Sequence, residues 1–479
     1  MVAALLILIP LLSGLAGFAI RRERGSRNWA VLSSAITLAV MIYGLTMVPA
    51  KQLGVDATWL PQLGSRFAVN LDGMSKMLCL LTALAFPLIF VATYKNTYAN
   101  PGRFYALMLL SQAGLMGVFM AVDCLVFYFF WELALIPVYF LCSIWGGEKR
   151  IAATFKFFIY TFAGSLLMLV GILYLYYQTP DHSFALASFY KLKLSASQQN
   201  VGFWLFLVAF AIKMPVFPFH TWQPDTYEQS PTAVTMVLSG IMVKMGVFGV
   251  LRWLLPVFPD AVSRFGNLVM IFSVIGILYA SLIAIRQDDL KRLIAYASIA
   301  HIGLMNAAIF SGQRLGIEGV MLQMFNHGII VIGMWIVADA IEKQTGTRKL
   351  SQLGGLAQKA PGLAILAVVM ALANIALPLT NGFVGEFLMF NGLFRYNPWM
   401  AFVAGISVIL AAVYTLGMIQ KIFYGTLNTA TENATEAGSN IRWVLVLLAI
   451  GIIILGVYPQ PVINLTKDTV DHLITQIQL

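Results

Sequence analysis

Long apolar runs follow one another along almost the whole chain, and they constrain its fold more than any other feature of the sequence. Of the 479 residues, 60% are hydrophobic and only 10% are charged. Hydrocarbon offers no water to satisfy backbone N–H and C=O groups, so a run that crosses about 30 Å of it must form a helix. The sequence therefore predicts an all-α integral membrane protein with many spans.

About fourteen runs are long enough to cross a bilayer. Their approximate bounds are residues 2–20, 29–49, 69–93, 104–121, 123–145, 153–177, 202–221, 230–255, 265–285, 291–311, 317–341, 362–394, 400–424 and 442–465. The net charge of +10 comes from lysines and arginines scattered over the short loops between these runs. Because they are spread over many short loops and form no single basic patch, no nucleic-acid binding is expected.

Two of the runs contain residues that interrupt a helix. In the seventh, Lys213 is followed within five residues by Pro215 and Pro218, and the twelfth, too long for one straight span, contains Asn374 and Pro378. The fourth to eighth runs and the ninth to thirteenth runs form two groups of five, and each interrupted run is the fourth in its group. Since five is odd, the second group enters the membrane from the opposite face, which predicts two inverted five-helix repeats.

We therefore divide the chain into four regions. They are the first three helices (1–103), a first repeat (104–256), a second, inverted repeat (257–425), and a last helix with its tail (426–479).

Basic residues are concentrated in alternate loops, beginning with Arg21, Arg22, Arg24 and Arg27 after the first span. Cytoplasmic loops carry such an excess, so both termini are expected on the outer, periplasmic side. The basic cluster follows the first span, whereas a secretory signal peptide has its basic residues before the apolar segment. We therefore expect the first span to be retained in the mature protein. This pattern suits the inner membrane of a bacterium, with a plastid or thylakoid membrane as the less favoured alternative.

Several runs carry a titratable residue near mid-span, among them Glu132 and Lys213. Burial disfavours the charged form of a lysine, and a nearby opposite charge restores it. A Lys213 partnered by Glu132 can be switched by moving its partner or by hydrating the site, which makes it a candidate proton valve. The alternative is a static ion pair that only locks helices together.

Lys244 lies among the small residues Ser239, Gly240, Gly246 and Gly249, which allow close helix approach and leave room for water. We expect it to be the central proton carrier. The alternative is that the long side chain of Lys244 extends its charged amine to the membrane–water interface.

His301, His327 and Glu386 extend the series. Histidine titrates near neutral pH, so His301 and His327 are candidates to pass protons between Lys244 and Glu386. Either histidine could instead be structural, bonded to a neighbouring hydroxyl or carbonyl group. Glu386 follows Asn381 closely in a segment suited to an unwound backbone, and is expected to be a terminal carrier near the outer exit or, alternatively, a static cap of the broken helix.

Several segments together resemble one membrane-protein family. They read FYFFWELALIPVYFL, FAIKMPVFPFHTWQPDTY, SGIMVKMGVFGVLR, DLKRLIAYASIAHIG, FNHG and NGFVGEF, and the resemblance extends from about residue 70 to 425. They are similar to the antiporter-like membrane subunits of respiratory complex I, NADH:quinone oxidoreductase, in particular the chain M type.

The resemblance implies a proton-translocating function for four residues matched by position: Glu132, Lys213, Lys244 and Glu386. Other members carry a lysine at the last position, so a glutamate there favours the chain M type. The resemblance also implies that this chain is one subunit of a translocase and performs no redox chemistry itself.

The resemblance further implies the partners. They are neighbouring antiporter-like subunits, the lateral helix of the largest one, the lipid bilayer and protons. NADH, FMN, iron–sulfur clusters and quinone belong to other subunits, and no cofactor or metal is expected in this chain. Cys79, Cys124 and Cys142 lie inside apolar runs at spacings unlike a metal or cluster motif.

Two alternatives stay open. The chain could be a subunit of a multisubunit Na⁺/H⁺ antiporter or of a membrane-bound hydrogenase with the same fold, and sodium could then replace protons. It could also be a scaffold whose buried charges only specify assembly.

Some charged residues are expected to lie outside the mechanism. Asp72 and Lys76 are four apart on one predicted helix and are expected to pair with each other. The segment RQDDLKR, from Arg286 to Arg292, is interpreted as a solvated cytoplasmic turn.

Overall fold

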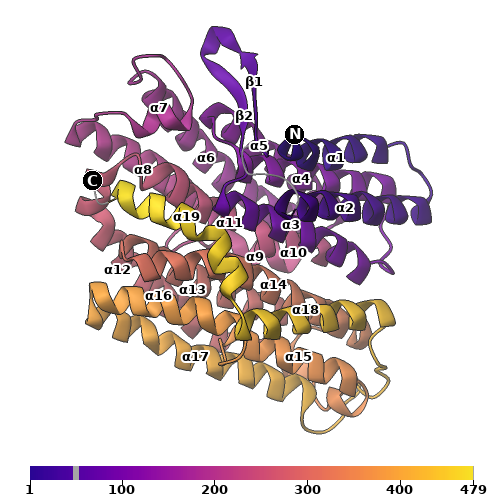
Figure 1. Ribbon diagram of the computed structural model, residues 1–479. Coiled ribbons are helices and arrows are strands. Elements are labelled where there is room, and N and C mark those ends of the chain that lie inside the picture. The colour runs from indigo at the N-terminus through magenta and orange to yellow at the C-terminus, as the bar shows by residue number, and fades with distance from the viewer. Residues whose placement is uncertain (47–52, 478–479) are drawn as a thin grey trace.

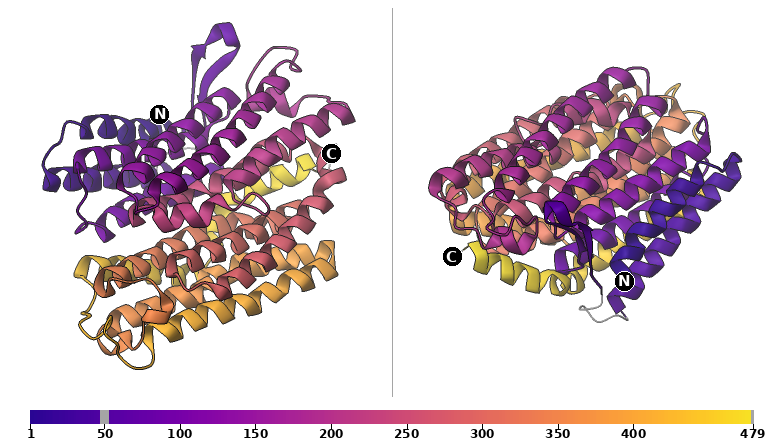
Figure 2. Two further views of the ribbon diagram at one scale, coloured as in Figure 1. Left: turned by 180° about the vertical axis from the view of Figure 1, so that it is seen from behind. Right: turned by 90° about the horizontal axis from the view of Figure 1, so that it is seen from above.

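The structure, a computed structural model, describes residues 1–46 and 53–477. Its helices lie side by side in one bundle, from which a β-hairpin extends (Figures 1 and 2). Strands β1 (Val55–Leu60) and β2 (Ser65–Val69) pair antiparallel in this hairpin, with Val55 opposite Val69. The all-α membrane fold is confirmed for the bundle, whereas the sequence patterns did not reveal the hairpin.

The helices follow the predicted order. The N-terminal region contains α1 (Val2–Gly17), α2 (Glu23–Thr46) and α3 (Gly73–Ala92). The first predicted repeat contains α4 (Pro101–Met120), α5 (Cys124–Trp145), α6 (Arg150–Tyr176), the short α7 (Leu186–Tyr190), α8 (Ala196–Lys213), α9 (Trp222–Gln229), α10 (Thr232–Val237), the π-helix η3 (Leu238–Met242), α11 (Lys244–Gly249) and the π-helix η4 (Val250–Leu254). The second contains α12 (Pro259–Arg286), α13 (Leu290–Phe310), α14 (Arg314–Thr345), the 3₁₀ turns η5 (Leu350–Gln352) and η6 (Leu356–Gln358), α15 (Pro361–Asn374), α16 (Asn381–Tyr396) and α17 (Pro398–Phe423); α18 (Ser439–Val457) and α19 (Gln460–Ile477) complete the chain.

Eleven helices of the described part are long and apolar enough to cross a membrane. The other predicted spans correspond to α1, which has 16 residues, and to the two interrupted runs. The full number of about fourteen therefore stays a prediction, and the predicted end of the second run at residue 49 lies outside the described residues.

Both predicted interruptions are present. Helix α8 ends at Lys213, and the chain turns through residues 214–221 before α9 begins. Helix α15 ends at Asn374 and α16 begins at Asn381, with Ala376 and Leu379 between them in the left-handed region at φ 54° and 75°. Prolines in both segments lack the N–H group that would continue a helix.

The bundle has two ends. We call one the basic-loop face, because it carries the loops of residues 18–22, 93–100, 146–149, 287–289, 346–360 and 424–438. We call the other the terminal face, because α1 begins there and α19 lies against it. Figure 2 shows α19 outside the main bundle.

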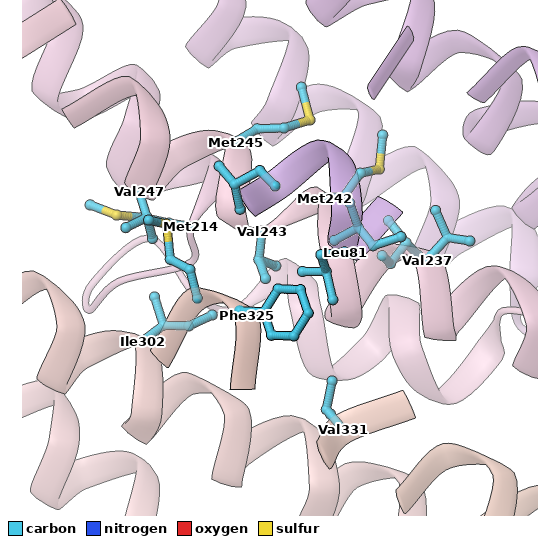
Figure 3. Close-up of a cluster of buried hydrophobic side chains, with 14 of the residues drawn as sticks. Leu81, Met214, Val237, Met242, Val243, Met245, Val247, Ile302, Phe325 and Val331 are labelled. Atoms are coloured by element: carbon cyan, nitrogen blue, oxygen red, sulfur yellow. The ribbon is translucent and has the colours of Figure 1, made fainter. Parts of the chain in front are cut away.

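The continuous helix of residues 232–254 (α10, η3, α11 and η4) is buried over its whole length, and α14 and α8 pack beside it. Figure 3 shows Leu81 of α3, Val243 and Phe325 of α14 among the apolar side chains at this centre. A Cβ atom added at Gly328 of α14 would lie 2.9 Å from the carbonyl oxygen of Gly240. Glycine therefore lets the two backbones nearly touch at the middle of the membrane.

The C-terminal region departs from the sequence prediction. The last span was expected to reach residue 465, but α18 ends at Val457 and the amphipathic α19 begins at Gln460. Pro459, between them, cannot continue the helix. The buried residues Val462, Thr466, Val470 and Leu473 of α19 recur at helical spacing, a signal that was present in the sequence.

Candidate functional site

A π-turn positions Lys244 at the centre of the buried helix. The N–H of Val243 donates to the carbonyl of Leu238, five residues back, so Lys244 follows one residue after a widened turn. Its Nζ donates to the carbonyl oxygen of Ser239 at 2.8 Å. Single π-turns inside α-helices are common at functional sites because they rotate the following side chains.

Lys244 and His327 contact each other directly. The Nζ of Lys244 lies 2.8 Å from the Nδ1 of His327 on α14, and the two residues are 1% and 2% exposed. Two positive charges so close in a buried site would repel strongly, so only one of the two groups holds the extra proton at a time. The pair can therefore share one proton.

A second pair, His301 and Glu386, lies on the side of His327 away from Lys244. The rings of His327 and His301 have centroids 5.5 Å apart, and the Nδ1 of His301 lies 2.8 Å from the Oε1 of Glu386. The Nε2 atom of each histidine is buried without a hydrogen-bond partner among the described residues. Four of the six residues selected from the sequence thus form a continuous row across α11, α14, α13 and α16.

The break before α16 is held against α14 by amide side chains. Asn326 donates to the carbonyl of Asn381 at 2.7 Å, and the Nδ2 of Asn381 donates back to the Oδ1 of Asn326 at 3.2 Å. A Cβ at Gly385 would lie 2.5 Å from the Oε1 of Gln323. Glu386 itself lies within α16, not in the unwound segment, and its carboxylate is positioned against α13 and α14.

Glu132 and Lys213 do not form the contact pair that the sequence suggested. Among the described residues no ion pair within 4.0 Å joins them; the Nζ of Lys213 lies instead 5.4 Å from the ring centroid of Trp131. The Nζ of Lys213 and the Oε1 of Glu132 are both buried and unpartnered in the described part of the chain. Glu132 is the neighbour of Trp131 on α5, and its charge still acts on Lys213 although the two groups lie beyond ion-pair distance.

The end of α8 that carries Lys213 packs against the continuous helix of residues 232–254, which we call the Lys244 helix. A Cβ at Gly246 would lie 2.7 Å from both the Cβ of Met214 and the carbonyl oxygen of Phe210. Glycine thus permits the approach of the two lysine-bearing segments. The cation at Lys213 also lies in the last turn of α8, where the negative end of the helix dipole favours it.

Sequence reasoning missed a network of ion pairs on the basic-loop face. Arg292 bridges Asp225 and Glu228 at 2.9 Å each, Lys156 contacts Asp225 at 2.8 Å, and Arg348 joins Glu228 at 2.8 Å. Arg348 also pairs with Asp289. The segment interpreted as a solvated turn is therefore an ordered connection between α9 of the first predicted repeat and α13 of the second.

The expected pair of Asp72 and Lys76 is also wrong. Asp72 accepts a hydrogen bond from the backbone N–H of Ser75 at 2.9 Å as the N-cap of α3, and its carboxylate pairs with Arg252 of η4. Its role as the N-cap directs the carboxylate away from the helix face that carries Lys76.

Comparison with known proteins gives consistent results. Residues 121–412 match the family described as NADH:quinone oxidoreductase/Mrp antiporter, TM. The chain is 35% identical to the F(420)H(2) dehydrogenase subunit M of Methanosarcina mazei, over 99% of this chain and 98% of that protein. It is 34% identical to the NADH-quinone oxidoreductase subunit M of Escherichia coli K12, over 98% of this chain and 96% of that protein.

One solved structure is similar over its whole length. A chain in the structure of respiratory complex I from Thermus thermophilus with bound NADH is 30% identical and superposes with a TM-score of 0.93, with 100% of both chains covered.

Proposed function

Because this chain belongs to the NADH:quinone oxidoreductase/Mrp antiporter family of transmembrane subunits, we propose that it is subunit M of a complex I-type NADH:quinone oxidoreductase and translocates protons. The main support is the buried row Lys244, His327, His301 and Glu386, with contacts of 2.8 Å at each end. A row of titratable groups that crosses four helices has a clear use in proton transfer, whereas a structural role requires only isolated pairs.

The row suggests a sequence of proton transfers. A protonated Lys244 donates to the Nδ1 of His327, and the resulting imidazolium releases the proton on its Nε2. The proton reaches the Nε2 of His301, directly after a ring rotation or through one bridging water, and the Nδ1 proton of His301 passes to Glu386. Water-bridged hydrogen bonds are nearly as favourable as direct ones, so the 5.5 Å between the imidazole rings is no barrier.

Lys213 acts in this scheme through its charge. It lies next to the segment that packs on Gly246, so a positive charge there disfavours a second one on Lys244. Glu132 screens the charge of Lys213 when the two groups approach each other. Movement of Glu132 or hydration of Lys213 then drives the proton of Lys244 toward His327.

The energy for this transfer comes from other subunits. We propose that NADH, FMN, iron–sulfur clusters and quinone are bound by them, and that neighbouring antiporter-like subunits and the lateral helix of the largest one contact the exposed apolar faces of α5, α6 and α17. The basic-loop face is cytoplasmic and the terminal face periplasmic in the inner membrane of a bacterium.

An antiporter or hydrogenase subunit is the second candidate, because the family description includes Mrp antiporters. The full-length similarity to subunits M of redox-driven complexes favours the first. Purification of the native complex distinguishes them: companion flavin and iron–sulfur subunits, with NADH-dependent quinone reduction, support the proposal, and their absence supports the antiporter.

The carrier role is tested by Lys244→Met in the intact complex reconstituted into vesicles. Protons pumped per NADH oxidised should fall, while the complex assembles and the control Lys421→Met, near the basic-loop end of α17, keeps the native ratio. A fully assembled Lys244→Met complex with an unchanged ratio would show that the row is only a scaffold.

A further inference from the structure

The Lys244 helix runs between two cavities at opposite faces. A cavity of about 590 Å³ at the basic-loop face is lined by Pro231, Thr232 and Gln344. A cavity of about 530 Å³ at the terminal face is lined by Leu251 and Arg252. Lys244 lies on the helix between them, so the groups along each half of the helix decide which cavity can exchange protons with it.

The half toward the basic-loop face is polar. The Oγ of Ser239 donates to the carbonyl of Thr235, and the Nζ of Lys244 donates to the carbonyl of Ser239. The Oγ1 of Thr235 lies 3.4 Å from the carbonyl oxygen of Tyr227. The hydroxyl of Tyr227 and both amide atoms of Gln223 are buried without a partner among the described residues, and such groups in native proteins are usually satisfied by water.

The half toward the terminal face is apolar and ends in a charge. Residues 245–251 carry no hydroxyl, amide or ionisable side chain. Phe248 lies midway, and the guanidinium of Arg252 stands 5.2 Å from its ring centroid. Protons that leave Lys244 in this direction would meet an aromatic ring and then a fixed cation.

Arg252 is held firmly in this position. It pairs with Asp72, lies 3.3 Å from the Oγ of Ser75 through its second terminal nitrogen, and is 9% exposed. Burial alone would raise the pKa of Asp72, but the charge and hydrogen bonds of Arg252 outweigh it and keep that pKa below its ordinary value. The Asp72 carboxylate therefore remains ionised at neutral pH, and its ion pair with Arg252 persists.

Helix α19 lines the outer side of this cavity with Leu465, Asp468 and His472. A Cβ at Gly73 would lie 2.3 Å from the carbonyl oxygen of Leu465, so α19 rests directly on the start of α3 beside Asp72. The charged groups that face Arg252 across the cavity are thus Asp72, Lys76, Asp468 and, when protonated, His472.

We propose that Arg252, anchored by Asp72, is an electrostatic barrier that prevents proton passage between Lys244 and the terminal face, so that Lys244 exchanges protons only with the basic-loop face and with His327. A guanidinium does not release its proton in a protein, so it cannot relay one. A fixed positive charge in a narrow, weakly polar path also repels hydronium and other cations. The inference rests on the proposed function of Lys244.

The test compares Arg252→Gln with Arg252→Lys in the intact complex reconstituted into vesicles. With an imposed pH gradient and no electron donor, the passive proton leak of Arg252→Gln should rise about tenfold or more, which corresponds to a barrier lowered by about 1.4 kcal/mol. Arg252→Lys keeps a positive charge and should leak little more than the native complex. NADH oxidation should stay near native in both variants, while protons pumped per electron fall only in Arg252→Gln.

Two further variants keep the test decisive. If Arg252→Gln alone fails to assemble, the double variant Asp72→Asn/Arg252→Gln replaces the ion pair by a neutral amide pair and should leak equally, because the positive charge is still gone. Adding Lys244→Met to the leaky variant should abolish the leak, whereas a general packing defect would leak regardless. A native leak in an assembled variant without the charge would overturn the barrier, and an unchanged pumping ratio in Lys244→Met would instead overturn the carrier role of Lys244.

Discussion

The Nζ of Lys244 and the Nδ1 of His327 lie 2.8 Å apart in the buried centre of the protein, although the two residues are 83 positions apart in the chain. A π-turn in one helix and a glycine contact between two helices together make this contact possible. It is the step on which the proposed proton path depends most directly.

Replacement of His327 by leucine should stop proton transfer from Lys244, because the new side chain has no group that accepts a proton. Protons pumped per electron should fall as far as in Lys244→Met, while the control His182→Asn, at an exposed position whose positive φ asparagine also adopts, stays native. The double variant should be no worse than either single one, since both residues lie on one path. Additive losses would place them on separate paths.

Glu386→Gln should keep the packing of α16 but lose its carrier function, because an amide still bonds to the Nδ1 of His301 without taking up a proton. Pumping should fall strongly in Glu386→Gln and partly in Glu386→Asp, as measured in vesicles. Glu432→Gln, at an exposed loop position, is the matched control. An active Glu386→Gln complex would leave Glu386 with only a structural role.

Gly328→Ala should separate Lys244 from His327 without changing either residue. The new Cβ would lie 2.9 Å from the carbonyl oxygen of Gly240, so the backbones must move apart at a cost of about 1–3 kcal/mol. Gly405→Ala is the control, since an added Cβ there has no heavy atom of the described structure within 4 Å. Lower thermal stability together with lower pumping is expected for Gly328→Ala alone, and native pumping would show that the close contact is unnecessary.

Lys213→Arg distinguishes a switchable charge from a fixed one. Arginine keeps the interaction with the ring of Trp131 but cannot lose its proton. If Lys213 acts by changing its charge, the arginine variant should pump as poorly as Lys213→Ala. Full pumping with arginine and failure with alanine would instead indicate a permanent cation that holds α8 against α5.

Arg348→Gln should weaken the connection between the two predicted repeats, because it removes a partner of Asp289 and one of the two arginine partners of Glu228. These groups are partly exposed, so we expect a loss of only about 1–2 kcal/mol. Lys349→Gln, at the neighbouring exposed residue, should have no effect. The measurement is the thermal stability of the purified complex at low and high salt, and equal stability of both variants would show that the network contributes little.

Local patterns were sufficient to predict much of this protein. The apolar runs predicted the membrane helices, and the prolines after Lys213 and near Asn374 predicted both breaks. The hairpin of β1 and β2 was missed because its strands are short and follow an apolar run closely. Helix α19 was missed because its pattern was interpreted as the end of a span, although Pro459 marked the boundary.

Hydrophobicity and backbone chemistry act locally, so the membrane environment, the helices and the apolar runs that carry ionisable residues could be predicted from the residues alone. Which ionisable residues meet depends instead on the packed fold: Lys244 contacts His327, Asp72 pairs with Arg252 and not with Lys76, and Lys213 lies over the ring of Trp131. Such contacts depend on how closely two helices approach and how each is rotated about its axis. Glycines, a π-turn and an N-cap on distant segments set these quantities jointly, and no single stretch of sequence contains them.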